Sequence, residues 1–182
     1  MSCEAPTQSA RGVTSAPGDI RETLTRHHGD TWAWALICCR GDRQAAHDVL
    51  HDVYVGVLSG RATFNARSKF KTWLFGVVRV TAMATRRRRI FLDFLFEPMD
   101  RHAERISAPE APDIASPRLR AAIAALPARQ REVVALVFAH DLTIEEAASV
   151  MKVSVGTARQ HHARAKEKLR AALSINQATE HE

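Results

Sequence analysis

Apolar residues along most of this chain recur at intervals of three and four, the spacing of amphipathic helices, and strand-like alternation is rare. The pattern falls into two blocks, residues 20 to about 91 and residues 118 to about 173. Prolines, which cannot continue a helix, interrupt the segment between them. These are Pro98, Pro109, Pro112 and Pro117. We therefore predict a protein that is almost entirely helical, built from two units and a linker.

The first block contains two strongly periodic helices separated by a polar break at 60–67. The apolar positions of the earlier helix are Ala45, Ala46, Val49, Leu50, Val53, Tyr54, Val57 and Leu58. Ser68 is placed to cap the later and longer helix. The predicted inner face of that helix consists of Phe70, Trp73, Leu74, Val77, Val78, Thr81 and Ala82.

Residues 142–169 have the pattern of a helix-turn-helix that continues into a basic helix. Thr143 and Glu146 form a capping box ahead of a short apolar helix. Lys152 begins the break, and Ser154 is placed to cap the second helix. A short helix packed across a second one that exposes polar residues early is the geometry that reads a major groove. A plain helical hairpin is the alternative, but it would have no reason to carry charges of one sign.

The charge is positive and unevenly distributed. The 182 residues carry a formal net charge of +6 and a pI near 9.8, which favours a polyanionic partner. Residues 61–90 contain cations and no acid, residues 93–113 are mainly acidic, and the helix after Lys152 is basic again. Two basic surfaces separated by an acidic segment predict two contacts with one long polyanion.

The cysteines and the apolar runs bear on the cellular setting. Cys3, Cys38 and Cys39 are odd in number and two are adjacent, which argues against a disulfide framework and favours a reducing cytoplasm. The N-terminal segment lacks the apolar centre of a signal peptide, and no apolar run reaches the about 18 residues of a membrane span. We therefore expect a cytoplasmic protein without membrane insertion.

Four strings follow one another along the chain: DVLHDVYVGVL (48–58), SKFKTWLFGVVRVTAMATRRRR (68–89), ALPARQREVVALVFAHDLTIEEAA (125–148) and SVGTARQHHARAKEKL (154–169). Together they resemble bacterial RNA polymerase sigma factors of the extracytoplasmic-function type, a branch of the sigma-70 family. The first looks like the helix that docks on the polymerase clamp, and the second like the helix that melts and reads the −10 element. The last two look like domain 4, which reads the −35 element.

This resemblance implies an all-α fold of two small domains, a sigma-2-like helical bundle and a sigma-4-like helix-turn-helix domain, joined by a flexible acidic linker. The implied segments are a disordered tail (1–18), region 2 (19–92), the linker (93–116), region 4 (117–175) and a second tail (176–182). The implied partners are core RNA polymerase, promoter DNA and an anti-sigma factor. Neither a cofactor nor a small-molecule substrate is implied.

The resemblance and the side-chain chemistry together assign candidate site residues. For −35 recognition these are Arg159, Gln160 and Arg164. Arginine can form two hydrogen bonds with guanine, and glutamine can form two with adenine. For DNA phosphates they are Ser154, Thr157, Lys166, Arg86, Arg87, Arg88 and Arg89. For the −10 element and the unpaired strand they are Phe64, Asn65, Lys69, Lys71 and Arg79. For polymerase binding they are Asp48, Asp52 and Tyr54.

Aromatic residues among these cations suit single-stranded DNA, whose bases can stack on exposed rings. Phe70 and Trp73 lie on the apolar face and are expected to belong chiefly to the core, whereas Phe75 is grouped with the aromatics of the basic helix. Phe64 and Asn65 fall in the loop that captures a flipped base in the family.

The chain also departs from the family pattern, which affects its promoter assignment more than its membership. Val80 and Ala84 stand where the family usually has Asn and Asp, and Gly76 replaces a usual Arg at a cost of roughly 1 kcal/mol in helix stability. Ala163 replaces a larger −35 contact, and His162 lies on a stripe that is otherwise apolar.

Three other functional classes fit less well. His27, His28, Cys38 and Cys39 suggest a metal or thiol sensor, but adjacent residues on a helix diverge by about 100°, so buried core cysteines fit better. A LuxR-type DNA-binding regulator would need a receiver or ligand pocket, and residues 20–90 show no βαβ pattern. An enzyme would need a catalytic constellation, and no Ser-His-Asp spacing, Walker loop or paired carboxylates are visible.

The segment Ile90–Phe96 is too apolar for a solvated linker. This suggests either that a helical anti-sigma factor covers the clamp-binding helix and the apolar face of domain 4 together and holds the two domains closed, or that the run extends the long basic helix and packs within the first domain.

Overall fold

The computed structural model describes residues 17–95 and 116–174, and these residues form helices and short connections with no strand among them. The first unit consists of α1 (Pro17–Arg26), α2 (His28–Cys38), α3 (Arg43–Leu58) and α4 (Phe70–Leu95). The second consists of α5 (Pro117–Ala124), α6 (Ala128–Val134), the π-helical turn η1 (Ala135–Ala139), α7 (Ile144–Met151) and α8 (Val155–Ser174). The all-α prediction is confirmed.

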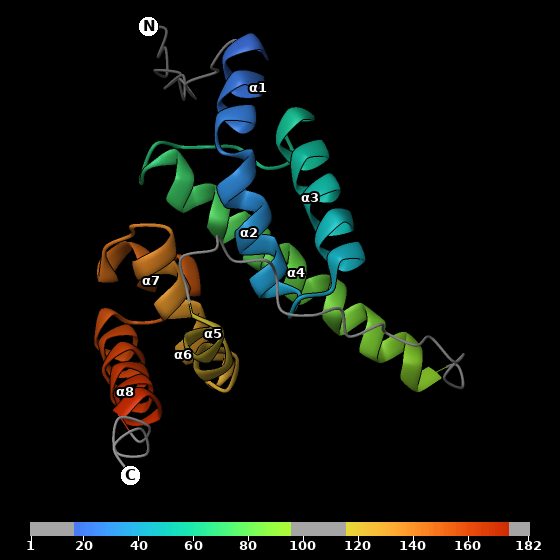
Figure 1. Ribbon diagram of the computed structural model, residues 1–182. Coiled ribbons are helices and arrows are strands. Elements are labelled where there is room, and N and C mark those ends of the chain that lie inside the picture. Colours follow the sequence, from blue (N-terminus) through green and yellow to red (C-terminus); the bar gives the residue numbers. More distant parts are fainter. Residues whose placement is uncertain (1–16, 96–115, 175–182) are drawn as a thin grey trace, which may run out of the picture.

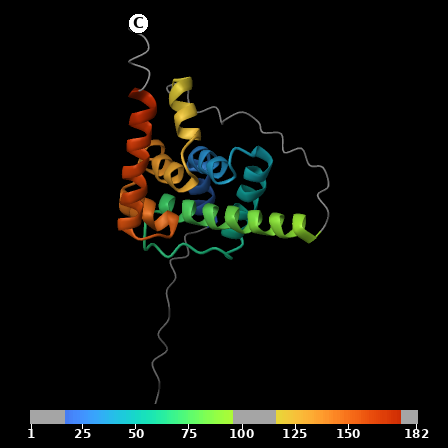
Figure 2. The same cartoon turned by 90° about the horizontal axis from the view of Figure 1, so that it is seen from below.

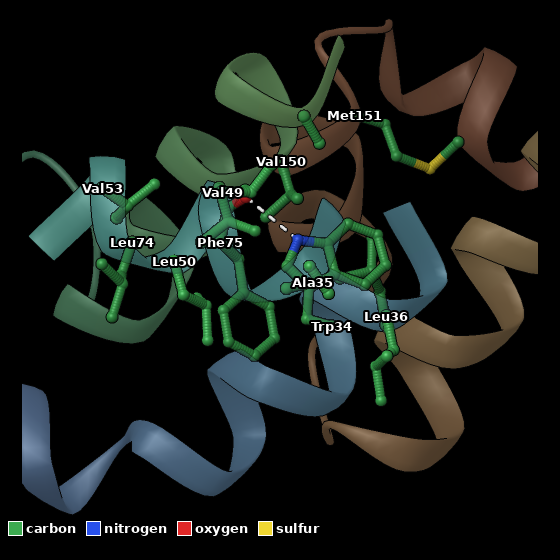
Figure 3. Close-up of a cluster of buried hydrophobic side chains, with 14 of the residues drawn as sticks. Trp34, Ala35, Leu36, Val49, Leu50, Val53, Leu74, Phe75, Val150 and Met151 are labelled. Carbon is green, nitrogen blue, oxygen red and sulfur yellow. Dashed lines mark hydrogen bonds between the residues drawn. The ribbon is translucent and has the colours of Figure 1, made fainter. Parts of the chain in front are cut away.

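The core of the first unit lies where α2, α3 and α4 pack against one another (Figure 1). Trp34 is fully buried there, and its indole Nε1 donates a hydrogen bond of 3.0 Å to the carbonyl oxygen of Phe75 (Figure 3). Leu74 and Val78 of α4 are also fully buried. The predicted apolar positions of α3 that are buried are Ala46, Val49, Leu50, Val53 and Val57. Helical periodicity therefore identified this core correctly.

The start of α4 differs from the prediction. The helix begins at Phe70, and the Ser68 hydroxyl donates to the carbonyl oxygen of Lys69 at 3.4 Å, which is not an N-cap interaction. An N-cap bond is found instead at α3, where Asp42 accepts a 2.9 Å hydrogen bond from the backbone N–H of Ala45.

The end of α4 extends into the segment that was assigned to the linker. The helix continues to Leu95, and its last turns project beyond the packed helices in both views (Figures 1 and 2). Ile90 and Phe91 are 57% and 59% exposed. The apolar run therefore extends the helix, as one of the two alternatives predicted. That alternative also predicted packing within the first unit, and the exposed Ile90 and Phe91 side chains do not show it. Residues 96–115 of the predicted linker lie outside the described residues.

The helix-turn-helix forms as its pattern predicted. Thr143 and Glu146 make the reciprocal capping box, and Lys152 ends α7 in the left-handed conformation with φ of 56°. Ser154 caps α8 by accepting a 3.1 Å hydrogen bond from the backbone N–H of Thr157. Ala158 and Ala165 are fully buried on the inner face of α8, which packs on α6 and α7.

The two units share one apolar core. Helices α4 and α7 lie against each other, and α7 sits beside the first turns of α4 (Figure 2). Val133, Leu136, Val150 and Met151 of the second unit belong to the same buried cluster as Leu74, Phe75 and Val78 of the first. Figure 3 shows Val150 and Met151 beside the residues of α2, α3 and α4.

Candidate polymerase and promoter interface

The recognition-helix residues lie on the open face of α8. Arg159, Gln160 and Arg164 are all exposed. Arg159 donates to the Oε1 of Glu145 on α7 at 3.0 Å, which draws its guanidinium toward the first helix of the motif. The pKa of Glu145 lies below its usual range because its carboxylate accepts a backbone hydrogen bond and the Arg159 bond. These three side chains are available to a major groove.

The N-terminus of α8 presents two hydroxyl groups. Ser154 is exposed and Thr157 half-buried, and their hydroxyl oxygens lie 2.8 Å apart. The backbone N–H groups of a helix N-terminus favour an anion, which suits the predicted phosphate contact. Lys166 lies further along the same helix and is half-buried.

An aromatic cluster closes the loop between α3 and α4. Phe64 is half-buried, with its ring 5.4 Å from those of both Phe70 and Trp73. Phe70 and Trp73 are also half-buried and pack against the core, so their assignment as chiefly core residues is supported. Asn65 is exposed beside this cluster, and its Oδ1 accepts a 3.4 Å hydrogen bond from the backbone N–H of Arg67. The loop thus presents an aromatic edge and an amide to solvent.

An open hollow of about 250 Å³ lies between this loop, α3 and α4. Its lining residues are Asp52, Val53, Gly56, Arg61, Ala62, Val77 and Thr81. The hollow has both polar and apolar walls, and it lies beside the loop that is predicted to contact the unpaired strand.

The three predicted −10 cations are each held by a carboxylate. Lys71 Nζ is 2.7 Å from Asp30 Oδ2, within the first unit. Burial would raise the pKa of Asp30, but the hydrogen bond and charge of Lys71 outweigh it and the pKa lies below its usual range. Lys69 and Arg79 pair instead with acids of the second unit, and the Arg79 side chain is only 4% exposed. In this conformation Arg79 is not open to DNA.

The arginine run at the end of α4 is exposed. Arg86, Arg87, Arg88 and Arg89 are all open to solvent, and the Nη1 of Arg89 lies 3.3 Å from Asp42 Oδ2 at the start of α3. Four neighbouring guanidinium groups can bind phosphates with little choice of sequence.

The outer face of α3 combines acids with apolar side chains. Asp48 and Asp52 are exposed, and Val55 and Leu58 on the same helix are 40% and 42% exposed. Tyr54 is half-buried, with its hydroxyl 3.0 Å from Nδ1 of His28. Burial raises the pKa of Tyr54, which is therefore a neutral hydroxyl at physiological pH. This acidic and apolar face is suited to docking on a protein.

The sequence interpretation missed the residues that join the two units. Phe75 is fully buried, so its grouping with aromatics open to DNA was wrong. Its ring lies 5.8 Å from that of Trp34 and 4.8 Å from that of His140. Burial lowers the pKa of His140, and both of its ring nitrogens lack a hydrogen-bond partner. Contact between the units brings Phe75 and His140 together, and the local sequence pattern carries no signal for this contact.

The possible sensor residues do not form one site. His27 stacks on Phe70 and His28 lies against Tyr54. Burial raises the pKa of Cys38 well above its usual value and that of Cys39 to about 11, so both thiols stay protonated at neutral pH and are poor nucleophiles. Within residues 17–95 and 116–174, no three metal-ligating side chains are grouped to hold an ion.

None of the helices in the described part of the chain combines the length and apolar character needed to cross a membrane.

Comparisons with known proteins agree with this arrangement. Residues 24–90 match the family described as Sigma-70 region 2, and residues 116–169 match Sigma-70, region 4. The ECF RNA polymerase sigma factor SigX of Bacillus subtilis (strain 168) is 28% identical over 137 residues, with 70% of each chain covered.

Two solved structures share the fold. The sigma factor RpoE from Bartonella quintana, in complex with the anti-sigma factor NepR, aligns with a TM-score of 0.68 and 22% identity over 87% of this chain and 98% of that one. CnrH, in complex with the cytosolic domain of CnrY, aligns with a TM-score of 0.60 and 20% identity over 92% and 95% of the two chains. With regions 2 and 4 both present and in family order, the chain belongs to the sigma-70 family of RNA polymerase sigma factors and is of the extracytoplasmic-function type.

Proposed function

We propose that the chain acts in the cytoplasm as a dissociable specificity subunit, which docks on core RNA polymerase through α3 and leads it to promoters through α4 and α8. The observation that supports this proposal best is the presence of three separate faces on one chain. One is an exposed acidic and apolar helix face, another a loop with aromatic edges beside a basic helix, and the third an open recognition helix. The polymerase would supply the catalysis.

The two DNA-facing parts differ in chemistry. Arg159 and Arg164 each offer paired donors, and Gln160 a donor and an acceptor, to base edges of a duplex at −35. Phe64 and Asn65 offer a half-exposed ring and an exposed amide to an unpaired −10 base. Arg86 to Arg89 would add affinity without sequence choice. The pairing of a duplex reader with a single-strand site fits promoter opening and does not fit a LuxR-type regulator.

We also propose an anti-sigma factor as the controlling partner. Both solved structures compared above contain an anti-sigma factor or a cytosolic partner domain. This chain exposes apolar side chains on both units, Val55 and Leu58 on α3 and Phe138 in η1, the last 61% exposed. A helical partner could cover these groups and block the polymerase contact.

Reversing one charge on α3 tests the docking assignment. Asp48→Lys or Asp52→Lys is expected to weaken binding to core RNA polymerase by about tenfold or more, because a like charge would face the polymerase's basic groups. The measurement is the Kd of the fluorescently labelled protein for purified core polymerase. Glu22→Lys, at an exposed acid of α1 that pairs with Arg26, is the charge-matched control and should bind as wild type does. Equal affinities for all three variants would remove α3 from the proposed interface.

A further inference from the structure

Region 4 packs against α4 and pairs with two cations of the first unit that are proposed to bind DNA, Arg79 and Lys69. Arg79 Nε lies 3.2 Å from Glu132 Oε2, and Lys69 Nζ lies 3.0 Å from Glu146 Oε1. Both cations belong to α4 and its leading loop, and both carboxylates belong to the second unit. Carboxylates and phosphates bind lysine and arginine by the same charge-assisted hydrogen bonds. The chain therefore holds its own acids against groups that would otherwise bind the −10 strand.

Apolar packing supports the same contact. Phe75 is fully buried between Trp34 and His140, and the His140 ring also lies edge-on to Trp34, at 6.2 Å. Val150 and Met151 of α7 are 1% exposed and belong to the same buried cluster (Figure 3). Apolar burial of this kind favours association without any fixed direction, whereas the two ion pairs fix how α6 and α7 are placed against α4 and its leading loop.

We infer that the −10-binding face of α4 is also a docking surface for the chain's own region 4, whose Glu132 and Glu146 take the place of DNA phosphates. In this closed form Arg79 and Lys69 are held by carboxylates and not by the unpaired promoter strand, and separation of the two units releases both cations together. The inference rests on the proposed function, which assigns α4 to the −10 strand. It requires no partner protein to bring the units together.

The contact contains one buried polar pair and one exposed pair. Burial raises the pKa of Glu132, while the charge and hydrogen bond of Arg79 lower it, and Arg129 of the same unit lies 3.1 Å from the same carboxylate oxygen, so both arginines hold the carboxylate. Removing one charge of such a pair leaves the other buried without a partner, which is strongly unfavourable. Lys69 is exposed, so its pair with Glu146 is screened by salt and adds less. Glu132 should therefore be the more sensitive of the two positions.

Small-angle scattering of the full chain tests the docking directly. The double variant Glu132→Gln/Glu146→Gln keeps the side-chain sizes, and glutamine at 146 can still complete the capping box. We expect a larger radius of gyration for this variant than for wild type. The control is Glu22→Gln/Glu167→Gln, which removes the same net charge from two exposed acids that are not paired with the other unit, and it should stay as compact as wild type. A wild-type chain as extended as the double variant would overturn the inference.

Binding of fluorescein-labelled single-stranded DNA of random sequence tests the competition. The double variant is expected to bind about tenfold more tightly than wild type, and the charge-matched control much less so. Equal tightening in both would mean that net charge alone is responsible and would overturn the inference. If the double variant loses helicity by circular dichroism, Glu146→Gln alone is compared with Glu167→Gln by the same two measurements.

The outcomes separate this inference from the proposed function. Scattering reports on the docking whether or not the chain serves a polymerase, so an extended wild-type chain contradicts the docking alone. A compact wild type that opens on substitution, yet gives no promoter-specific transcript with core polymerase, contradicts the proposed function alone.

Discussion

Replacing Arg159 or Arg164 with alanine is expected to relax the choice of −35 sequence, at a cost of about 1–3 kcal/mol for each bidentate base contact that is lost. Both side chains are exposed on α8, so each can reach a groove without any rearrangement of the helix. Arg159 would exchange its exposed 3.0 Å pair with Glu145 for the base contact. The measurement is open-complex formation by reconstituted holoenzyme on a cognate promoter and on a set of single-base −35 mutants.

Two controls separate specificity from general affinity. Lys168→Ala removes an exposed cation from the same helix and should leave the ranking of −35 mutants unchanged. Neutralising two of the residues Arg86 to Arg89 should weaken all promoters alike and reduce the salt dependence of binding, because these contacts would go to phosphates. An Arg164→Ala holoenzyme that ranks the −35 mutants as wild type does would remove Arg164 from the recognition site.

Replacing Trp34 with alanine is expected to lower the free energy of unfolding by about 3–5 kcal/mol. The side chain is fully buried, donates a 3.0 Å hydrogen bond to the carbonyl oxygen of Phe75, and contacts the rings of both Phe75 and His140. Its loss leaves a cavity where both units meet. Chemical denaturation followed by circular dichroism measures the change.

Trp32 provides the matched control for this substitution. It lies two residues away on the same helix and is only half-buried, so Trp32→Ala should cost clearly less than Trp34→Ala. Equal losses for the two variants would contradict the position of Trp34 at the centre of the shared core.

Local signals in the sequence predicted the helices and most of their ends. The capping box of Thr143 and Glu146 and the cap at Ser154 were identified correctly because each depends on residues within one turn. Ser68 was misassigned because a serine before an apolar run is only one of several ways to begin a helix, and α4 starts at Phe70. The apolar stripe of α4 identified Leu74 and Val78 in the same way, from spacing alone.

The contact between the units could not be predicted from those signals. Arg79 and Glu132 are separated by 53 positions, and nothing in the spacing of either residue marks the other as its partner. An amphipathic pattern identifies one apolar face, whereas α4 buries Phe75 and Arg79 on a further face that region 4 covers. Arg79 was predicted at an open DNA site, but it is buried here because the second unit covers it and Glu132 pairs with it. Its contact with the −10 strand stays a prediction for the opened form.

Transcription by purified components is the most direct test of whether the chain directs core RNA polymerase to specific promoters. Core RNA polymerase is mixed with the full chain and a library of genomic promoter fragments, and the 5′ ends of the transcripts are sequenced. We expect transcripts that depend on the chain and start downstream of a shared pair of −35 and −10 elements, with the −35 choice altered by Arg159→Ala. Transcripts that are the same with and without the chain, together with specific duplex binding by the chain alone, would contradict it.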